Sequence, residues 1–233
     1  MAIKDLLVNL QDESNLLLKL DLYLESQPSQ RKPDGMYHPS MAGQCPRAIY
    51  YYQTGLAKKS FSPETIRRMD NGTKVHERMQ EYFENMGILL EKEKPIKFTV
   101  KSPAPSITVT GSCDGIILLN KEKHVLEIKS ANNFMFGKFV KEGYDSSHFI
   151  QWNLYSYGCK IWQGLLLYEN KDNQKLHVYN LKFDKATFNR TIEKFKKVEK
   201  AVKAKKIVPR PYKGMTEKTC LWCDFKDACW EGG

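Results

Sequence analysis

The stretch GSCDGIILLNKEKHVLEIKS, residues 111–130, decides the fold class. Two apolar runs flank the turn signal NKEK at 120–123, an arrangement that predicts an antiparallel hairpin. Asp114 precedes the first run, whereas Glu127 and Lys129 stand near the end of the second. Residues two apart in a strand leave the same face, so Glu127 and Lys129 are expected side by side, and the hairpin brings Asp114 to them.

These three side chains suggest metal chemistry. Two carboxylates held close together repel each other, unless a proton or a cation lies between them. Mg²⁺ is commonly held by one or two carboxylates plus water and substrate phosphate, which fits Asp114 and Glu127. Lys129 would then position a water molecule or neutralise charge that develops on a phosphate. An ordinary hairpin with surface Asp, Glu and Lys remains the alternative.

Outward from the hairpin, the chain alternates between strand and helix patterns. Ser62 and Pro63 are the N-cap and first residue expected of a helix that runs to about Gly87, with an apolar face. Strands are expected at 96–101, 106–119 and 124–130, a second helix at 147–160, and a second hairpin at 163–169 and 175–183. A long helix capped by Asp184 follows, with an apolar core face and a lysine-rich outer face. The order predicts an α/β fold, a mixed sheet with helices packed around it. The apolar residues expected to face the core are Ile66, Met69, Val75, Met79 and Phe83 in the helix after Ser62, and Phe188, Ile192, Phe195, Val198 and Val202 in the helix after Asp184.

Composition narrows the partners and the compartment. The 233-residue chain carries 37 Lys and Arg against 27 Asp and Glu, a net charge of +10, which favours polyanions such as nucleic acid. The apolar N-terminal segment 1–20 predicts a helix, and its interruption by Asp5, Asp12 and Glu13 argues against a signal peptide. No segment is long and apolar enough to suggest a membrane span. We therefore expect a cytoplasmic protein.

Four of the six cysteines suggest a metal or cluster site. Cys220, Cys223 and Cys229 stand close together near the C-terminus, and Cys45 is the best candidate for a fourth ligand. Thiolates suit either Zn²⁺ or an iron-sulfur cluster, and the spacing leaves both open. Cys113 and Cys159 are expected to be plain buried thiols, with Cys113 as an alternative ligand beside Asp114.

Several motifs together resemble the PD-(D/E)XK nuclease superfamily, in its RecB-like branch with a four-cysteine iron-sulfur cluster. Besides Asp114, Glu127 and Lys129, the chain has a Gly-x-x-x-His motif at 72–76, a Gln-x-x-x-Tyr motif at 151–155 and the early and late cysteines. The branch includes AddB-type nuclease domains and CRISPR-associated exonucleases. The resemblance covers residues 38 to 230 and implies a restriction-endonuclease-like sheet.

The resemblance also implies residue roles. The metal ligands would be His76, Asp114, Glu127 and Ile128, binding Mg²⁺ or Mn²⁺, and the cysteines would hold a 4Fe-4S cluster, with Zn²⁺ as the alternative. Gly72 would allow its helix to approach the sheet. Lys129, Gln151 and Tyr155 complete the catalytic set, and Gln151 and Tyr155 would contact DNA together with Arg47. The implied organisation is a single nuclease domain, 1–233, with a catalytic core at 62–206 and a cluster subdomain formed by 38–60 and 207–233.

The function predicted on this basis is a metal-dependent exonuclease that releases nucleotides or short fragments from the ends of single-stranded or frayed DNA. Arg47, the run Tyr50 to Tyr52 and the lysine-rich helix offer phosphate contacts and stacking surfaces, although the tyrosines could instead pack in the core. Recombination, repair, phage DNA processing and CRISPR adaptation are the candidate settings. A helicase or a CRISPR adaptation protein would be a separate chain, because no P-loop motif appears. Two alternatives stay open: a catalytically silent DNA-binding scaffold, and a zinc-binding RNA-processing factor.

Overall fold

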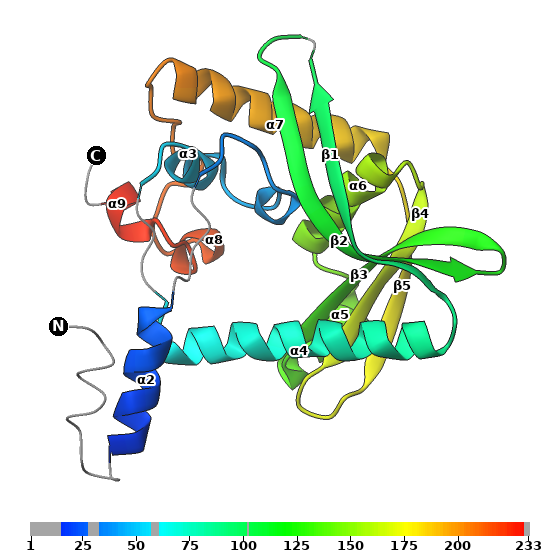
Figure 1. The fold of residues 1–233 in the computed structure, drawn as a ribbon. Helices are drawn as coiled ribbons and strands as arrows, with labels where there is room; N and C mark the ends of the chain where they lie inside the picture. Colours follow the sequence, from blue (N-terminus) through cyan, green and yellow to red (C-terminus); the bar gives the residue numbers. More distant parts are fainter. Residues whose placement is uncertain (1–14, 28–32, 57–60, 102, 231–233) are drawn as a thin grey trace.

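Five strands form one sheet in the part of the chain described by the computed structural model, residues 15–27, 33–56, 61–101 and 103–230, with the order β1-β2-β3-β4-β5 (Figure 1). Neighbouring strands are antiparallel, except that β3 and β4 are parallel, so the sheet is mixed as predicted. The strands are β1 (Leu89–Val100), β2 (Ile107–Leu119), β3 (Glu122–Ala131), β4 (Gln163–Asn170) and β5 (Leu176–Lys182).

The β2–β3 hairpin has the register that the sequence predicts. Leu119 pairs with Glu122, so Asn120 and Lys121 alone form the turn, with φ values of 51° and 67°. Positive φ at both central residues is typical of the tight turns whose twist matches that of paired strands. At the other end of the register Gly115 pairs with Leu126, which places Asp114 next to Glu127.

One face of the sheet is covered by α4 (Pro63–Asn85), which begins as predicted where the Ser62 side chain accepts a hydrogen bond from the Thr65 amide. Figure 1 shows α4 running across this face. Val75 and Met79 are buried against strand residues. Phe83 packs at the edge of this cluster. Met69 was predicted to face the core but is exposed, because the first turns of α4 extend beyond the sheet.

The opposite face is covered by α5 (Asn133–Glu142), α6 (Ser146–Cys159) and α7 (Lys185–Lys203). The helix α5 was not predicted from the sequence. It begins at the Asn132 cap and buries Phe136 and Phe139. Together α5 and α6 form the crossover that parallel strands β3 and β4 require.

The long helix α7 has the predicted Asp184 cap and buried face, with Val202 only partly buried. Its lysine-rich face is not all solvated. Lys196 is buried and bonded to Glu193, and Lys194 donates to the main-chain oxygens of Ala42 and Gln44. The predicted outer face is lysine-rich, but it is partly covered at these two positions, and the chain before α3 covers Lys194.

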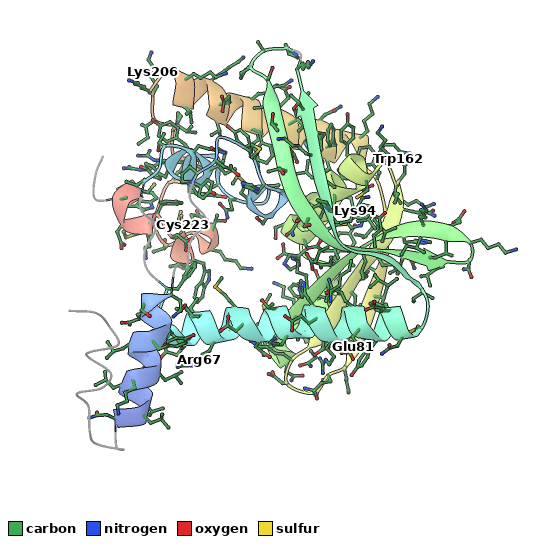
Figure 2. The ribbon with its side chains drawn as sticks, viewed as in Figure 1. Arg67, Glu81, Lys94, Trp162, Lys206 and Cys223 are labelled. Atoms are coloured by element: carbon green, nitrogen blue, oxygen red, sulfur yellow. The ribbon has the colours of Figure 1, made fainter. Side chains whose placement is uncertain are left out.

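The terminal segments lie together at one side of the sheet. They comprise α2 (Leu16–Ser26), the 3-10 helix η2 (Pro39–Met41), α3 (Pro46–Gln53), α8 (Lys218–Leu221) and α9 (Lys226–Trp230). Figure 1 shows α3 beside α8 and α9, and Figure 2 places Cys223 in this group. Residues 1–14 of the predicted first helix lie outside the described residues. No helix in the described ranges is long and apolar enough to cross a membrane.

Candidate active site

Three predicted hairpin residues, Asp114, Glu127 and Lys129, meet His76 from α4 in one place, which we call the acidic site. The Ile128 amide donates to Asp114 Oδ2 at 2.5 Å, so the Asp114 carboxylate is fastened to β3 between Glu127 and Lys129. Lys129 Nζ lies 2.6 Å from Glu127 Oε1. Backbone register and these two contacts together bring both carboxylates and the ammonium group into one cluster.

His76 reaches the acidic site from α4. Its Nδ1 atom lies 3.2 Å from Asp114 Oδ1. Burial disfavours the imidazolium, but the hydrogen bond and charge of Asp114 outweigh it and raise the pKa of His76. The predicted role of Gly72 in close approach is not supported, because a Cβ there would meet only Ser130 Oγ, at an ordinary 3.9 Å.

Glu127 is a buried carboxylate with few groups around it to stabilise its charge. Its side chain is only 1% exposed, and apart from the ion pair with Lys129 neither carboxylate oxygen has a hydrogen-bond partner among the described residues. Burial and the charge of Asp114 raise the pKa of Glu127 to about 7, against the opposing effect of Lys129 and His76. A buried carboxylate this poor in donors is a favourable place for a cation.

The donor set fits a hard divalent ion only in part. Asp114 and Glu127 supply the carboxylate oxygens that Mg²⁺ and Mn²⁺ prefer, and Ile128 could contribute only its main-chain carbonyl. Throughout the described ranges, however, no three His, Cys, Asp or Glu side chains are grouped so that they could hold a metal ion. Ion binding at the acidic site would therefore need small side-chain movements, with water and substrate completing the coordination.

The Gln-x-x-x-Tyr motif lies on α6, with Gln151 Nε2 3.5 Å from the Tyr155 hydroxyl. Tyr155 is 5% exposed, and burial together with the charge of Glu127 raises its pKa. Gln151 is partly exposed. Tyr155 is thus buried beside Gln151, and its direct contact with DNA stays a prediction.

Two α4 residues that the sequence analysis missed, Arg78 and Gln80, connect this helix to the acidic site and the sheet. The Gln80 amide donates to the main-chain oxygen of Asp114 at 2.8 Å and to Glu93 Oε1 at 2.7 Å. Arg78 Nη2 lies 2.5 and 2.6 Å from the two oxygens of buried Glu169 on β4. The available signal was a polar Gln80 one helical turn after His76, on the face that should be apolar.

The DNA contact at Arg47 stays a prediction, and in this structure the residue is buried. Arg47 is 7% exposed, and its Nε donates to the Tyr51 hydroxyl at 3.0 Å. Tyr50, Tyr51 and Tyr52 are also buried, in the core that α3 shares with α7. The core-packing alternative therefore holds for the tyrosine run, since α3 is enclosed between α7 and the C-terminal segment.

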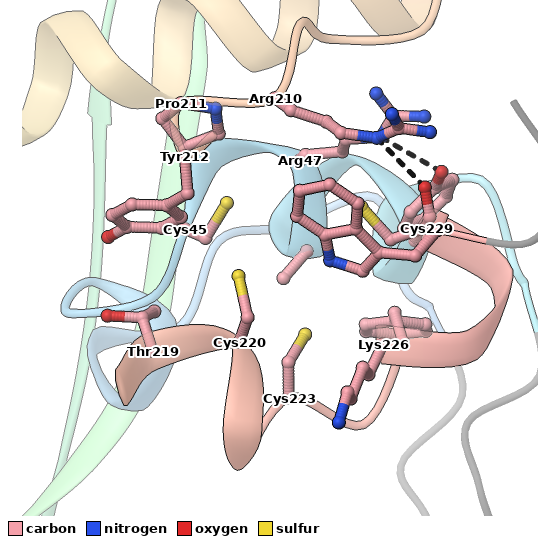
Figure 3. A pocket seen from close by; sticks show the side chains of 14 residues that line it. Cys45, Arg47, Arg210, Pro211, Tyr212, Thr219, Cys220, Cys223, Lys226 and Cys229 are labelled. Atoms are coloured by element: carbon pink, nitrogen blue, oxygen red, sulfur yellow. Dashed lines mark hydrogen bonds between the residues drawn. The ribbon is translucent and has the colours of Figure 1, made fainter. Parts of the chain in front are cut away.

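Cys45, Cys220, Cys223 and Cys229 line one pocket, which we call the cysteine pocket. Figure 3 shows the side chains of Cys45, Cys220 and Cys223 around this pocket. Burial raises the pKa of Cys220 and of Cys223, and the neighbouring thiols of Cys45 and Cys229 add to the effect. The predicted grouping of the four cysteines is thus present, although in the described part of the chain no three of them are arranged to hold a metal ion.

The two remaining cysteines form a pair of their own. Cys113 is fully buried, with its Sγ 4.0 Å from Cys159 Sγ and 3.6 Å from the Gly115 oxygen. These contacts are those of the buried thiol that was predicted rather than of a ligand beside Asp114. Cys159 is only partly buried, since it lies at the end of α6.

Comparisons with known proteins identify the fold. No protein-family model matches the chain, and no curated protein matches it either. The crystal structure of SSO0001 is similar with a TM-score of 0.61 and 18% identity, covering 91% of this chain and 94% of that one. LHK-Exo in complex with dAMP is similar with a TM-score of 0.54 and 12% identity. The alkaline exonuclease LHK-Exo from Laribacter hongkongensis gives 0.52 and 13%, and both LHK-Exo comparisons cover 73% of this chain and 89% of that one.

The chain thus has the fold of an alkaline exonuclease, at identities that show the fold alone. This confirms the α/β class with a mixed sheet flanked by helices. Fold does not determine function, so the functional conclusion has to come from the acidic site.

Proposed function

We propose that the chain is a Mg²⁺- or Mn²⁺-dependent exonuclease that hydrolyses phosphodiester bonds at the ends of single-stranded or frayed DNA. The observation that carries the proposal is Glu127, a buried carboxylate beside Asp114 and His76, to which Lys129 alone among the described residues offers a donor. The shared fold with an exonuclease supports it. DNA is the expected partner, consistent with the net charge of +10.

Each residue of the acidic site has a role in this proposal. Asp114, Glu127, His76 and the Ile128 carbonyl would hold the ion, which when bound polarises the phosphodiester and lowers the pKa of water. Lys129 would neutralise charge developing on the phosphate, since its ammonium group points into the same cluster. Gln151 would orient the strand, and Tyr155 would hold Gln151 in place through the contact between their side chains.

We further propose that the cysteine pocket holds a 4Fe-4S cluster, with Zn²⁺ as the alternative. The support is that thiols from distant parts of the chain line one pocket. Soft thiolates suit both kinds of centre, so iron, sulfide and zinc analysis of anaerobically purified protein separates them. A cluster there would link the terminal segments to the core.

The biological setting that we propose is cytoplasmic DNA processing, in recombination, repair, phage DNA processing or CRISPR adaptation, alongside a separate helicase or adaptation protein.

The test is cleavage of end-labelled DNA by the full chain. Wild type should degrade single-stranded DNA with Mg²⁺ or Mn²⁺ and not with EDTA, whereas Asp114→Asn should be inactive because it removes the negative charge of a proposed metal ligand, while its amide oxygen can still accept from the Ile128 amide. Lys123→Gln, an exposed change on the same hairpin, is the matched control. Equal cleavage by wild type and Asp114→Asn would refute the site. Tight DNA binding without cleavage would instead favour the silent scaffold, and cleavage of RNA alone would favour the RNA-processing factor.

A further inference from the structure

A histidine that the motifs do not include lies beside the acidic site. His148 is on α6, three residues before Gln151 and seven before Tyr155, so the three side chains share one helical face. Lys129 on β3 pairs in register with Tyr168 on β4, and the Tyr168 hydroxyl contacts the imidazole. The side chain is partly exposed, and Tyr168 on β4, the strand neighbour of Lys129, is its hydrogen-bond partner.

The hydrogen-bond network determines which ring nitrogen of His148 carries the proton. The Asp145 amide donates to the Tyr168 hydroxyl oxygen at 3.2 Å, and this hydroxyl lies 2.8 Å from His148 Nδ1. Among the described residues no other acceptor is available for the Tyr168 hydrogen. Tyr168 therefore donates to Nδ1, and the proton of a neutral His148 must lie on Nε2.

The surroundings of His148 keep its ring neutral. Burial lowers the pKa of His148 to about 4, and the Lys129 ammonium adds to this, while Asp145 opposes it. The other groups packed against the ring are Phe139 from α5 and the Tyr168 phenol. At neutral pH His148 is thus a fixed, uncharged Nε2–H donor. Across the described chain the structure gives that donor no acceptor.

We propose that His148 is a further substrate-binding residue, whose Nε2–H donates to a non-bridging phosphate oxygen of the DNA strand held at Lys129 and Gln151. The proposal rests on the proposed function for its substrate class. A phosphate oxygen is the acceptor that the position favours, because the neighbouring ammonium attracts an anion and repels a second donor cation. A neutral donor can bind the same phosphate as Lys129 without that repulsion.

Two substitutions at His148 separate this role from simple packing. The amide of His148→Gln can donate from near the Nε2 position but does not retain the acceptor for Tyr168, whereas His148→Asn retains a group near Nδ1 and loses the donor. We expect His148→Asn to raise the KM for a short single-stranded oligonucleotide, and its Kd with Ca²⁺ replacing Mg²⁺, by about tenfold. His148→Gln should stay within about threefold of wild type. His124→Gln, at the far end of β3, is the control.

The reverse order, with His148→Asn nearer to wild type than His148→Gln, would show a structural contact to Tyr168 and overturn the proposal. Imidazole ¹⁵N spectra of the DNA-free protein, with the resonance identified by its loss in His148→Gln, provide a second measurement. They should show the Nε2–H tautomer at pH 7, and an Nδ1–H form or an imidazolium would overturn the proposal whatever the enzyme does.

The outcomes also separate this proposal from the proposed function. If wild type binds DNA without cleaving it and His148→Asn still weakens binding, the nuclease proposal fails and the role of His148 stands. If wild type cleaves normally and all His148 variants bind and cleave alike, the role of His148 fails alone. Thermal melting of each variant shows that it is folded.

Discussion

The acidic site and the cysteine pocket are built in opposite ways. In the acidic site Asp114, Glu127 and Lys129 come from one hairpin, and main-chain register and hydrogen bonds hold the groups together. In the cysteine pocket Cys45 meets residues 220–229 from the other end of the chain. At its edge the Arg210 side chain lies over the Trp230 ring at 4.7 Å and donates to the Cys229 main-chain oxygen at 3.0 Å.

This difference implies that substitutions in the acidic site should mainly affect catalysis, whereas substitutions in the cysteine pocket should mainly affect stability. A hairpin supports its side chains locally, so the acidic site needs little from the chain ends. The metal centre that we propose for the cysteine pocket would link distant positions of the chain. Such a link stabilises mainly by restricting the unfolded chain, which is worth about 3 to 5 kcal/mol for a loop this long. Damage to one region should therefore leave the other region largely intact.

The largest expected effect is on catalysis. Lys129→Met retains the length of the side chain and removes the ammonium group that pairs with Glu127. We expect kcat for DNA cleavage to fall by about 10² to 10³, the range for loss of one charge-stabilising donor. The melting temperature should change by only a few degrees, and iron or zinc content should not change. A variant that retains a tenth of wild-type kcat would show that Lys129 is not part of the chemistry.

The next effect is on stability. Cys220→Ser should lower the melting temperature by roughly 6 to 12 °C, because loss of a few kcal/mol shifts a domain of this size by about 2 to 4 °C for each. Iron or zinc content should fall with it, while cleavage per folded molecule at low temperature stays within about threefold. Cys159→Ala, outside the cysteine pocket, is the control and should retain the bound metal. Equal melting temperatures for wild type and Cys220→Ser would refute the proposal that a metal centre in the cysteine pocket stabilises the fold.

A smaller loss is expected where α4 supports the acidic site. Gln80→Leu removes the donor to the Asp114 main chain while retaining bulk. Residues that orient metal ligands typically contribute about 10- to 100-fold to affinity or activity, and we expect the lower end, since the Ile128 amide still holds the Asp114 side chain. Kinetics at several Mn²⁺ concentrations should show the loss as weaker metal activation. Gln53→Leu, which loses a donor to the Met36 oxygen away from the acidic site, is the control.

The raised pKa of Glu127 predicts a pH dependence. When a carboxyl group has a higher pKa in the folded than in the unfolded protein, the folded protein loses stability as the pH rises between the two values. For Glu127 these values are 4.5 and about 7. In EDTA, Glu127→Gln should therefore melt close to wild type at pH 4.5 and roughly 2 to 6 °C above it at pH 8. The pKa of His76 is raised and that of His148 is lowered to about 4 in the folded protein, so the measured quantity is the difference between the two proteins. A constant difference across this range would contradict the raised pKa.

The smallest effect is expected at the motif glycine. Gly72→Ala should leave cleavage within about twofold and stabilise α4 by about 0.5 to 1 kcal/mol, because its Cβ has room. Gly164→Ala is the contrast, since a Cβ there would lie 2.1 Å from the Val125 oxygen. Thermal melting of both variants measures the change in stability that the added Cβ causes at each position. A large loss of activity in Gly72→Ala with no loss of stability would mean that substrate needs the space beside Gly72.

Much of the fold could be predicted from local patterns. The Ser62 and Asp184 caps, the Asn120–Lys121 turn and the alternation in β2 and β3 depend on residues close in sequence, and these elements formed as predicted. The helix α5 escaped prediction, although its Asn132 cap is of the expected type.

The sequence by itself determined the hairpin and the grouping of Asp114, Glu127 and Lys129, because strand register and a two-residue turn are local properties of the chain. Tertiary packing alone decided that Arg47 and the tyrosines are buried, that Gln80 holds the Asp114 main chain, and that the Tyr168 hydroxyl meets His148 Nδ1. Burial and long-range hydrogen bonds depend on which surfaces meet, and no spacing along the chain records that.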